Sequence, residues 1–272
     1  MVKAGEAGGV LDLVLDRLAQ FQEKSIRTIK KVKSAMIYPS VIMFVAVGIV
    51  TLLMMVVVPQ FQTIFEQMLR GAPLPGPTQI VVGISDLFAS HPILVLGGMG
   101  GLVGGVILLK KTKQGAKAFD WLGLKVPVVR EVVSKSNVSR ITRTFGTLLS
   151  SGVPILQALQ ITGDTLTNVF FIKAMNNVHN AVRDGESMAV QMEREPVFPT
   201  MVTSMVEIGE ETGELPDMLT RIADNYDEDV DNAVAGVTSL IEPVMIVFLA
   251  VVVGFIVIAL FLPIVAIIEN IG

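Results

Sequence analysis

The fold follows from the stretch MIYPSVIMFVAVGIVTLLMMVVV, residues 36–58, in which no side chain is charged. A helix rises about 1.5 Å per residue, so about 20 apolar residues cross the hydrocarbon core of a bilayer. Two further apolar runs cover residues 92–110, charged only at the final Lys110, and residues 237–268, charged only at Glu242 near the start. We therefore predict an all-α membrane protein with three transmembrane helices embedded in the lipid bilayer.

The composition agrees with a membrane protein. Hydrophobic residues make up 51% of the 272 residues and charged residues only 17%, and the mean hydropathy is +0.65. Soluble domains of this length usually carry more charge. The net charge of −4 gives no basic surplus that would indicate nucleic acid as a partner. The absence of cysteine excludes disulfides and thiolate metal sites.

The distribution of lysine and arginine predicts the direction of the spans. Basic residues precede the first span and follow the second, whereas the only basic residue of the connecting segment 59–91 is Arg70. Those before the first span are Lys24, Arg27, Lys30, Lys31 and Lys33, and those after the second are Lys110, Lys111, Lys113 and Lys117. Cytoplasmic flanks carry this excess. We expect residues 1–35 and 111–236 on the cytoplasmic side. The loop 59–91 and the tail to 272 are expected on the periplasmic side.

Glycines recur along one face of the middle span. Gly97, Gly101 and Gly105 are four residues apart, a spacing that allows close approach of helix backbones in lipid. The alternative is that the glycines merely weaken this helix. The pattern favours tight packing.

An internal repeat is the most informative feature of the chain. With a constant offset of 204 residues, the turn Gly5-Glu6-Ala7-Gly8-Gly9 aligns with Gly209-Glu210-Glu211-Thr212-Gly213, and Pro39 and Pro59 align with Pro243 and Pro263. A shared turn and two prolines in register indicate duplication rather than chance similarity of apolar segments. Residues 1–35 correspond only to the end of the second cytoplasmic domain. We therefore expect an incomplete first copy, in which Met1 opens in the middle of a domain.

Residues 111–236 show helical periodicity without strand alternation. Breaks at glycine and proline divide them into six predicted helices: about 129–151, 155–165, 168–183, a short one to about 193, 199–208, and one from Pro216 onward. Pro154 suits the first turn of its helix. We predict a six-helix bundle that continues into the third span.

Several stretches resemble the type II secretion system F family. They are residues 143–155, residues 209–213 and residues 241–264, with the motif positions Gly146, Gly152, Pro154, Gly209, Glu210, Gly213, Pro243 and Pro263. Members are polytopic platform proteins of type II secretion and type IV pilus machines. The run Tyr226–Val234 looks closer to the pilus members. The resemblance covers nearly the whole chain, except for the front of the first copy.

The resemblance implies a scaffold in the bacterial inner membrane. It would couple a cytoplasmic secretion or pilus ATPase to the assembly of pilin or pseudopilin, contact other inner-membrane platform subunits, and form homo-oligomers. The competing hypotheses are a transporter or permease subunit and an intramembrane enzyme. Both are disfavoured, because the spans lack charged residues at mid-depth.

The residues indicate no enzyme and no cofactor. The sequence has no G-x-x-x-x-G-K-[ST] loop, so the energy for assembly must come from a partner. His91 and His179 read as ordinary surface histidines. Four glutamates around the second glycine turn are weak candidates for a divalent cation site: Glu207, Glu210, Glu211 and Glu214. A solvated acidic turn is the favoured reading, because the spacing fits no EF-hand.

The helices that enter the first and third spans carry opposite charges. Lys30, Lys31 and Lys33 precede the first span, and Asp227, Glu228 and Asp229 precede the third. One hypothesis is that these helices pair, within one chain or between protomers. The other is that the lysines only obey the positive-inside rule. The sequence does not decide between them.

Overall fold

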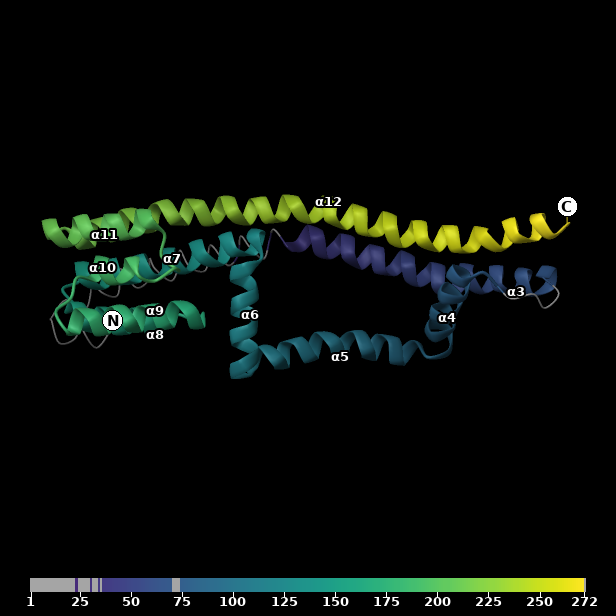
Figure 1. The fold of residues 1–272 in the computed structure, drawn as a ribbon, viewed down its shortest axis with the longest axis horizontal. Coiled ribbons are helices and arrows are strands. Elements are labelled where there is room, and N and C mark those ends of the chain that lie inside the picture. The colour runs from purple at the N-terminus through teal and green to yellow at the C-terminus, as the bar shows by residue number, and fades with distance from the viewer. Residues whose placement is uncertain (1–22, 24–29, 31–33, 35, 70–73, 272) are drawn as a thin grey trace. The chain divides into compact units, whose positions relative to one another are not determined.

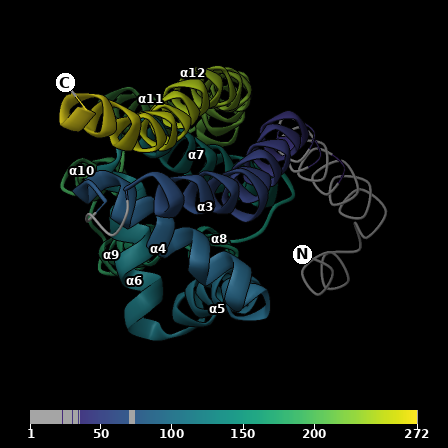
Figure 2. The same cartoon turned by 90° about the vertical axis from the view of Figure 1, so that its right-hand side faces the viewer.

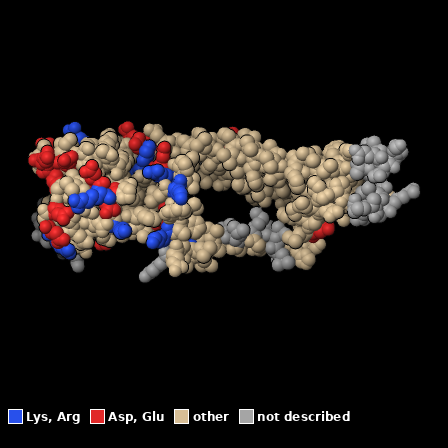
Figure 3. Space-filling view, in the orientation of Figure 1, with Lys and Arg blue, Asp and Glu red and all other residues tan. Residues whose placement is uncertain are grey.

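The computed structural model describes residues 23, 30, 34, 36–69 and 74–271. Within this part of the chain every regular element is helical, and there is no strand (Figure 1). The chain divides into two compact units: Met1–Ser34 with Lys110–Val237, and Ala35–Leu109 with Thr238–Gly272. Charged side chains gather over the first unit, and the second is almost free of them (Figure 3). We call them the charged unit and the apolar unit.

The apolar unit contains the predicted spans. Residues 36–52 are α-helical and continue through a short π-helix, η1 (Leu53–Val57), into α3 (Val58–Leu69). After α4 (Gly76–Ser90) comes α5 (Pro92–Lys111), and the unit ends with the second part of α12 (Leu215–Ile271). Among the described residues, two helices are long and apolar enough to cross a membrane, Ile37–Phe65 and Leu215–Val265. The middle predicted span coincides with α5; that it crosses the bilayer stays a prediction.

The segment 59–91, predicted as a loop, is mostly helical. One face of α4 is buried at the spacing i, i+3, i+4, i+7, through Thr78, Val81, Val82 and Ser85. Val81 and Val82 pack in a cluster with residues of the first span, of α3 and of α12: Met54, Val58, Phe65, Ile256, Ala259 and Leu260. Figures 1 and 2 show α4 beside α3. The prediction treated this segment only as the connection between two spans and did not consider this apolar stripe.

The charged unit is a set of packed helices. They are α6 (Lys113–Lys125), α7 (Pro127–Ser150), α8 (Ile155–Asp164), α9 (Val169–Arg183), α10 (Met188–Glu193), α11 (Thr200–Thr212) and the first part of α12. The last six begin and end within four residues of the predicted positions. The structure adds α6, for which the sequence reading gave no helix.

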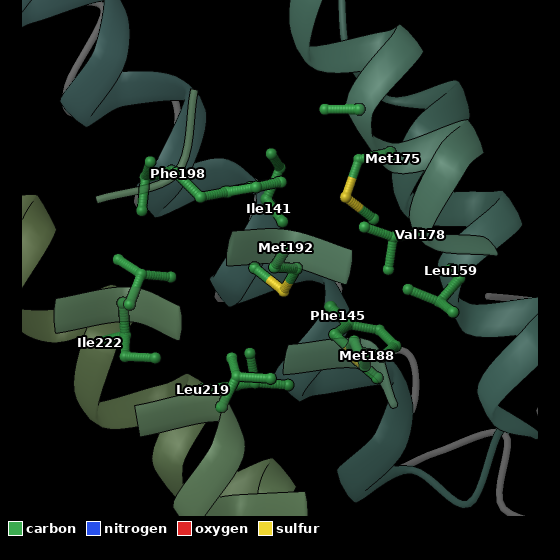
Figure 4. Packing of buried hydrophobic residues seen from close by; sticks show 14 of the residues in the cluster. Ile141, Phe145, Leu159, Met175, Val178, Met188, Met192, Phe198, Leu219 and Ile222 are labelled. Atoms are coloured by element: carbon green, nitrogen blue, oxygen red, sulfur yellow. The ribbon is translucent and has the colours of Figure 1, made fainter. Parts of the chain in front are cut away.

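One hydrophobic core holds the charged unit together. Phe145 of α7, Leu159 of α8, Val178 of α9, Met188 of α10 and Leu219 of α12 are nearly or fully buried in it (Figure 4). Complete burial of such a side chain contributes about 1.5–3 kcal/mol. The core therefore draws on α7 through α12, although α10 has only six residues.

Local signals explain where these helices begin. The Asn168 side chain accepts hydrogen bonds from the backbone N–H groups of Phe170 and Phe171, and Ser187 accepts one from Val190. Such caps satisfy donors that have no partner inside the helix. Pro154 is at the N-cap of α8, one residue ahead of the predicted first helical position.

Candidate functional site

The glycine turn of the second copy is a point of close helix approach. A Cβ atom at Gly209 would lie 2.9 Å from the Cα of Leu215 and 3.1 Å from the Cγ of Met218. Gly213 caps α11 with a φ of +76°, in the left-handed region that favours glycine. Together the two glycines allow the chain to reverse so that α12 packs directly against α11.

Glu210 of this turn holds the start of α10. Its Oε1 accepts a hydrogen bond from the Met188 N–H at 3.0 Å, and its Oε2 accepts from the Ala189 N–H at 3.2 Å. The Ser187 hydroxyl also donates to Oε2, at 2.8 Å. A carboxylate at a helix N-terminus satisfies free N–H groups and interacts favourably with the helix dipole. Glu210 thus links α11 to α10.

The other three glutamates of the turn do not join Glu210 in a cation site. Glu207, Glu211 and Glu214 are exposed. Among the described residues no three His, Cys, Asp or Glu side chains come together in a group that could hold a metal ion. Glu210 has a structural role at the start of α10, and the cation site stays untested.

Gly146, a motif residue of α7, also lies at a close contact between helices. A Cβ atom at Gly146 would lie 3.1 Å from the Cβ of Leu219 and 3.4 Å from the carbonyl oxygen of Pro216. Gly152 follows Ser151, the C-cap of α7, in the turn that leads to Pro154 and α8. The motif residues of the charged unit therefore serve packing and chain reversal.

A polar network joins α7 to the acidic part of α12. The Arg143 Nη2 lies 2.6 Å from Asp224 Oδ1 and 2.7 Å from Asp227 Oδ2. The Ser139 hydroxyl donates to the other oxygen of Asp227, and Lys135 forms an ion pair with Asp229 at 3.6 Å. The Arg143 side chain is only 18% exposed. Removal of its partners would therefore leave a charge poorly solvated.

Two pKa values in this region depart from their usual range. Burial lowers the pKa of Arg143, but the hydrogen bonds and charges of Asp224 and Asp227 outweigh it, so the pKa is raised. Burial, with a smaller contribution from the charge of Asp229, raises the pKa of Tyr226. At neutral pH Arg143 is charged and Tyr226 is neutral. The network therefore joins α7 to α12 around a charged Arg143.

The proposed pairing between the lysines of the first copy and this acidic stretch stays a prediction. Asp227 and Asp229 form ion pairs with Arg143 and Lys135 of α7, whereas Glu228 forms no ion pair within the described part of the chain. Lys30 is exposed, and Lys31 and Lys33 lie outside the described residues. Because two of the three acids already have basic partners on α7, the lysines of the first copy would have to share these carboxylates.

In the apolar unit, the prolines at two equivalent positions of the repeat each leave one backbone carbonyl without its helical donor. Pro263 has no N–H and cannot donate to the carbonyl of Ala259, four residues earlier. In the π-helix the Val58 N–H donates to Leu53, five residues earlier. By the same spacing the next donor, for Met54, would be residue 59, which is also proline. Each copy thus leaves one carbonyl without its helical partner.

The helix α4 supplies both missing donors. The Thr78 hydroxyl donates to the carbonyl oxygen of Ala259 at 2.5 Å, and the Ser85 hydroxyl donates to that of Met54, also at 2.5 Å. Both side chains are 0% exposed. An unpaired carbonyl is costly in an apolar environment. Thr78 and Ser85 are two turns apart on one helix, so α4 bridges the two copies; we call these two residues the hydroxyl brace.

The two spans run in the same direction. Near their beginnings the Tyr38 hydroxyl donates to Glu242 Oε1 at 3.3 Å, and these positions are 204 residues apart. Toward their ends α4 contacts Met54 of the first span and Ala259 of the second copy. With the offset of 204, Met54 corresponds to residue 258, one residue before Ala259. Equivalent residues meet in this way when two copies face each other across a local twofold axis.

The glycines of α5 have no packing partner among the described residues. A Cβ atom at Gly97, Gly101 or Gly105 would meet no atom within 4 Å. Tight packing at this face therefore stays a prediction, and its partner would have to come from outside the described part of this chain.

These features define a helical membrane protein with a duplicated span and a charged helical unit. The model of the family described as "Type II secretion system (T2SS), protein F" matches residues 1–59 and 141–263. The two matched ranges end 263 − 59 = 204 residues apart, which equals the offset of the repeat. The chain belongs to the type II secretion system protein F family.

Curated relatives are similar over nearly the whole chain. The type IV pilus assembly protein PilC of Myxococcus xanthus is 41% identical over 96% of this chain and 62% of its own length. PilC of Thermus thermophilus is 42% identical over 100% of this chain and 67% of its own length. The type II secretion system protein F of Aeromonas hydrophila is 35% identical over 97% of this chain and 68% of its own length. The chain thus spans about two thirds of the length of these relatives.

Sequence reasoning missed Thr78, Ser85 and Arg143. The prolines gave a usable signal for the first two, because a proline inside an apolar span requires a donor from elsewhere. A search for Thr and Ser on the buried face of α4 would have found them. Arg143 lay within the family-like stretch but was not examined as the partner of the acidic residues of α12.

Proposed function

We propose that the protein is an inner-membrane platform that couples a cytoplasmic motor ATPase to the assembly of pilin or pseudopilin filaments. The observation that carries this proposal is membership of the family, with relatives named as pilus assembly and type II secretion proteins. The sequence contains no phosphate-binding loop, so a partner must hydrolyse ATP. The protein itself acts as a scaffold and not as an enzyme.

A three-span topology follows from the direction of the repeat. Since the two repeated spans are parallel, the chain must cross the membrane once more between them. Helix α5 has 20 residues and is uncharged until Lys110 and Lys111 at its end, which suits a returning span. In this topology the charged unit is cytoplasmic, and residues 59–91 and the C-terminus are periplasmic.

The charged unit is the proposed binding surface for the motor ATPase or another platform subunit. In the face that Figure 3 shows, acidic and basic side chains gather over this unit, and one hydrophobic core holds it together. Binding by exposed charges gives partner selection and orientation. We expect further platform subunits and additional copies of the chain to contact the apolar unit within the bilayer.

The absence of cysteine permits a clean test of the topology. Ser90→Cys at the end of α4 and Lys173→Cys on α9 both replace exposed residues. In spheroplasts, a membrane-impermeant maleimide should label the Ser90 variant at once and the Lys173 variant only after lysis. The parent chain controls for background. Labelling of the Lys173 variant before lysis would contradict the proposed topology.

A second experiment tests the coupling role. The full chain, solubilised in detergent, should retain the motor ATPase encoded with the same pilus or secretion system. Purified alone, it should hydrolyse no ATP above a vector control. Hydrolysis by the isolated chain, or failure to retain the ATPase when the topology is confirmed, would refute the platform assignment.

A further inference from the structure

One face of α6 is exposed although it carries large apolar side chains. The exposed positions are Gln114, Lys117, Ala118, Trp121, Leu122 and Lys125. They recur three or four residues apart and so form one stripe along the helix. Trp121 and Leu122 are each 50% exposed. The stripe therefore combines an aromatic and an aliphatic side chain with two lysines; we call it the α6 stripe.

The opposite face of α6 is seated on the bundle. Leu124 packs against the hydrophobic core, and the Cα of Gly123 faces Val129 and Val133 of α7. Asp120 accepts a hydrogen bond from the Val169 N–H at 2.9 Å, at the start of α9. These contacts fix the rotation of α6 about its axis. The stripe is thus held outward by the fold of the charged unit.

The surroundings of the stripe are strongly basic. Residues 110–130 contain six lysines or arginines and a single acid, Asp120, in a chain whose net charge is −4. That acid is engaged with α9. Lys125 lies over the Trp121 ring, with its Nζ 4.4 Å from the ring centre. A surface that complements this stripe should carry negative charge beside an apolar layer.

The position of α6 in the chain indicates which surface this is. Helix α5 ends at Lys111 and α6 begins at Lys113, so only Thr112 separates them. Consecutive Cα atoms are 3.8 Å apart. If α5 crosses the bilayer, the first turn of α6 therefore lies at the level of the lipid headgroups. Tryptophan is favoured at this level, and lysines there attract anionic headgroups.

We propose that the α6 stripe docks on the membrane surface, with Trp121 and Leu122 in the interfacial layer and Lys117 and Lys125 on anionic lipid headgroups. This inference rests on the proposed crossing by α5. Docking would hold the charged unit on the membrane surface through α6, in addition to the chain connections that join it to the apolar unit. Amphipathic basic helices bind membranes in this manner.

Trp121 is the only tryptophan of the chain and can report the docking directly. The full chain is reconstituted in nanodiscs of equal parts phosphatidylglycerol and phosphatidylcholine, with lipids brominated close to the headgroup. We expect brominated lipid to quench the Trp121 emission, and aqueous acrylamide to quench it weakly. Trp121→Phe supplies the background signal. Strong acrylamide quenching without bromine quenching, or protection from both quenchers, would overturn the proposal.

The lysines are tested by a matched pair of charge reversals. Lys117→Glu lies in the stripe, whereas Lys173→Glu alters an exposed lysine on α9. We expect Lys117→Glu to lower the ratio of docked to undocked α6 at least about fivefold, which corresponds to about 1 kcal/mol per lysine at an anionic surface. The Lys173 variant should match the parent. Equal quenching in both variants, or in pure phosphatidylcholine, would contradict the role of anionic headgroups.

This readout is independent of the platform assignment. A nanodisc exposes both faces of the bilayer, so quenching of Trp121 does not depend on which side is cytoplasmic or on any motor ATPase. The cysteine labelling therefore detects a wrong topology, whereas the Trp121 fluorescence detects an α6 stripe that stays exposed to water.

Discussion

The two repeated spans each lack a backbone donor at a proline, but their local helix geometries differ. Each carries a proline at the equivalent position, Pro59 or Pro263, and each loses one backbone donor. The first span changes to a π-helix over Leu53–Val57, whereas α12 remains α-helical through Pro263. In both cases the freed carbonyl accepts a hydroxyl from α4. Duplication therefore preserved the proline but not the local helix geometry, and one outside helix serves both copies.

Removal of the hydroxyl brace should have the largest effect on stability. The double variant Thr78→Val with Ser85→Ala leaves the carbonyls of Ala259 and Met54 buried without a donor. We expect it to lower the free energy of unfolding by about 2–3 kcal/mol. Reversible unfolding in mixed micelles measures this. Thr63→Val is the matched control, because its exposed hydroxyl bonds only within its own helix. A loss no larger than in the control would show that the brace is dispensable.

Replacing each proline by alanine should restore the missing backbone donor and test the need for each hydroxyl in turn. In Pro263→Ala the new N–H can reach Ala259, so Thr78→Val should cost about 1 kcal/mol less in that background. In Pro59→Ala the new N–H can bond to Met54 within the π-helix, or the Val58 N–H can bond to Met54 if the π-helix relaxes to an α-helix. In either case the Met54 carbonyl gains a backbone donor, so Ser85→Ala should also cost about 1 kcal/mol less in that background. The same unfolding assay gives both double-mutant cycles. Absence of coupling in either cycle would show that the hydroxyl of α4 does not replace the donor that the proline removes.

The contact between the equivalent residues Tyr38 and Glu242 should contribute less. It is exposed and 3.3 Å long, so Tyr38→Phe should change the free energy of unfolding by about 0.5 kcal/mol. Glu242→Gln can still accept the hydrogen bond and serves as the milder comparison. A loss above that of the brace variant would indicate that the beginnings of the spans, rather than α4, hold the copies together.

The glycine face of α5 should have the smallest effect on the unfolding of the single chain. No described atom lies within 4 Å of a Cβ at Gly101, so Gly101→Leu should leave unfolding within about 0.5 kcal/mol of the parent. It should nevertheless reduce assembly with other subunits, because a bulky side chain holds helix backbones apart. Native electrophoresis of Gly101→Leu beside Gly101→Ala compares the two. Assembly equal to the parent in both would refute the packing hypothesis.

Local patterns were sufficient for much of this fold. The apolar runs, the glycine turn at 209–213 and the helix boundaries from Pro127 to Leu215 depend on residues that are near each other in the sequence. The offset of 204 was visible as identity of turns and prolines. The prediction missed α6 and the burial of α4, because their buried sides form only when these helices pack against others: α7 and α9 for α6, and η1, α3 and α12 for α4.

The pairing of polar groups required the three-dimensional arrangement. The sequence indicates that Pro59 and Pro263 remove donors, but not that Thr78 and Ser85 replace them, because hydrogen bonds depend on positions and angles set by the packing of α4. Likewise the acids of α12 could pair with the lysines of the first copy or with α7, and charge alone does not distinguish these. The rotation of α7 places Arg143 beside Asp224 and Asp227. Composition and periodicity thus indicate which segments are apolar enough to enter a membrane, while the packing of the helices determines which polar atoms meet.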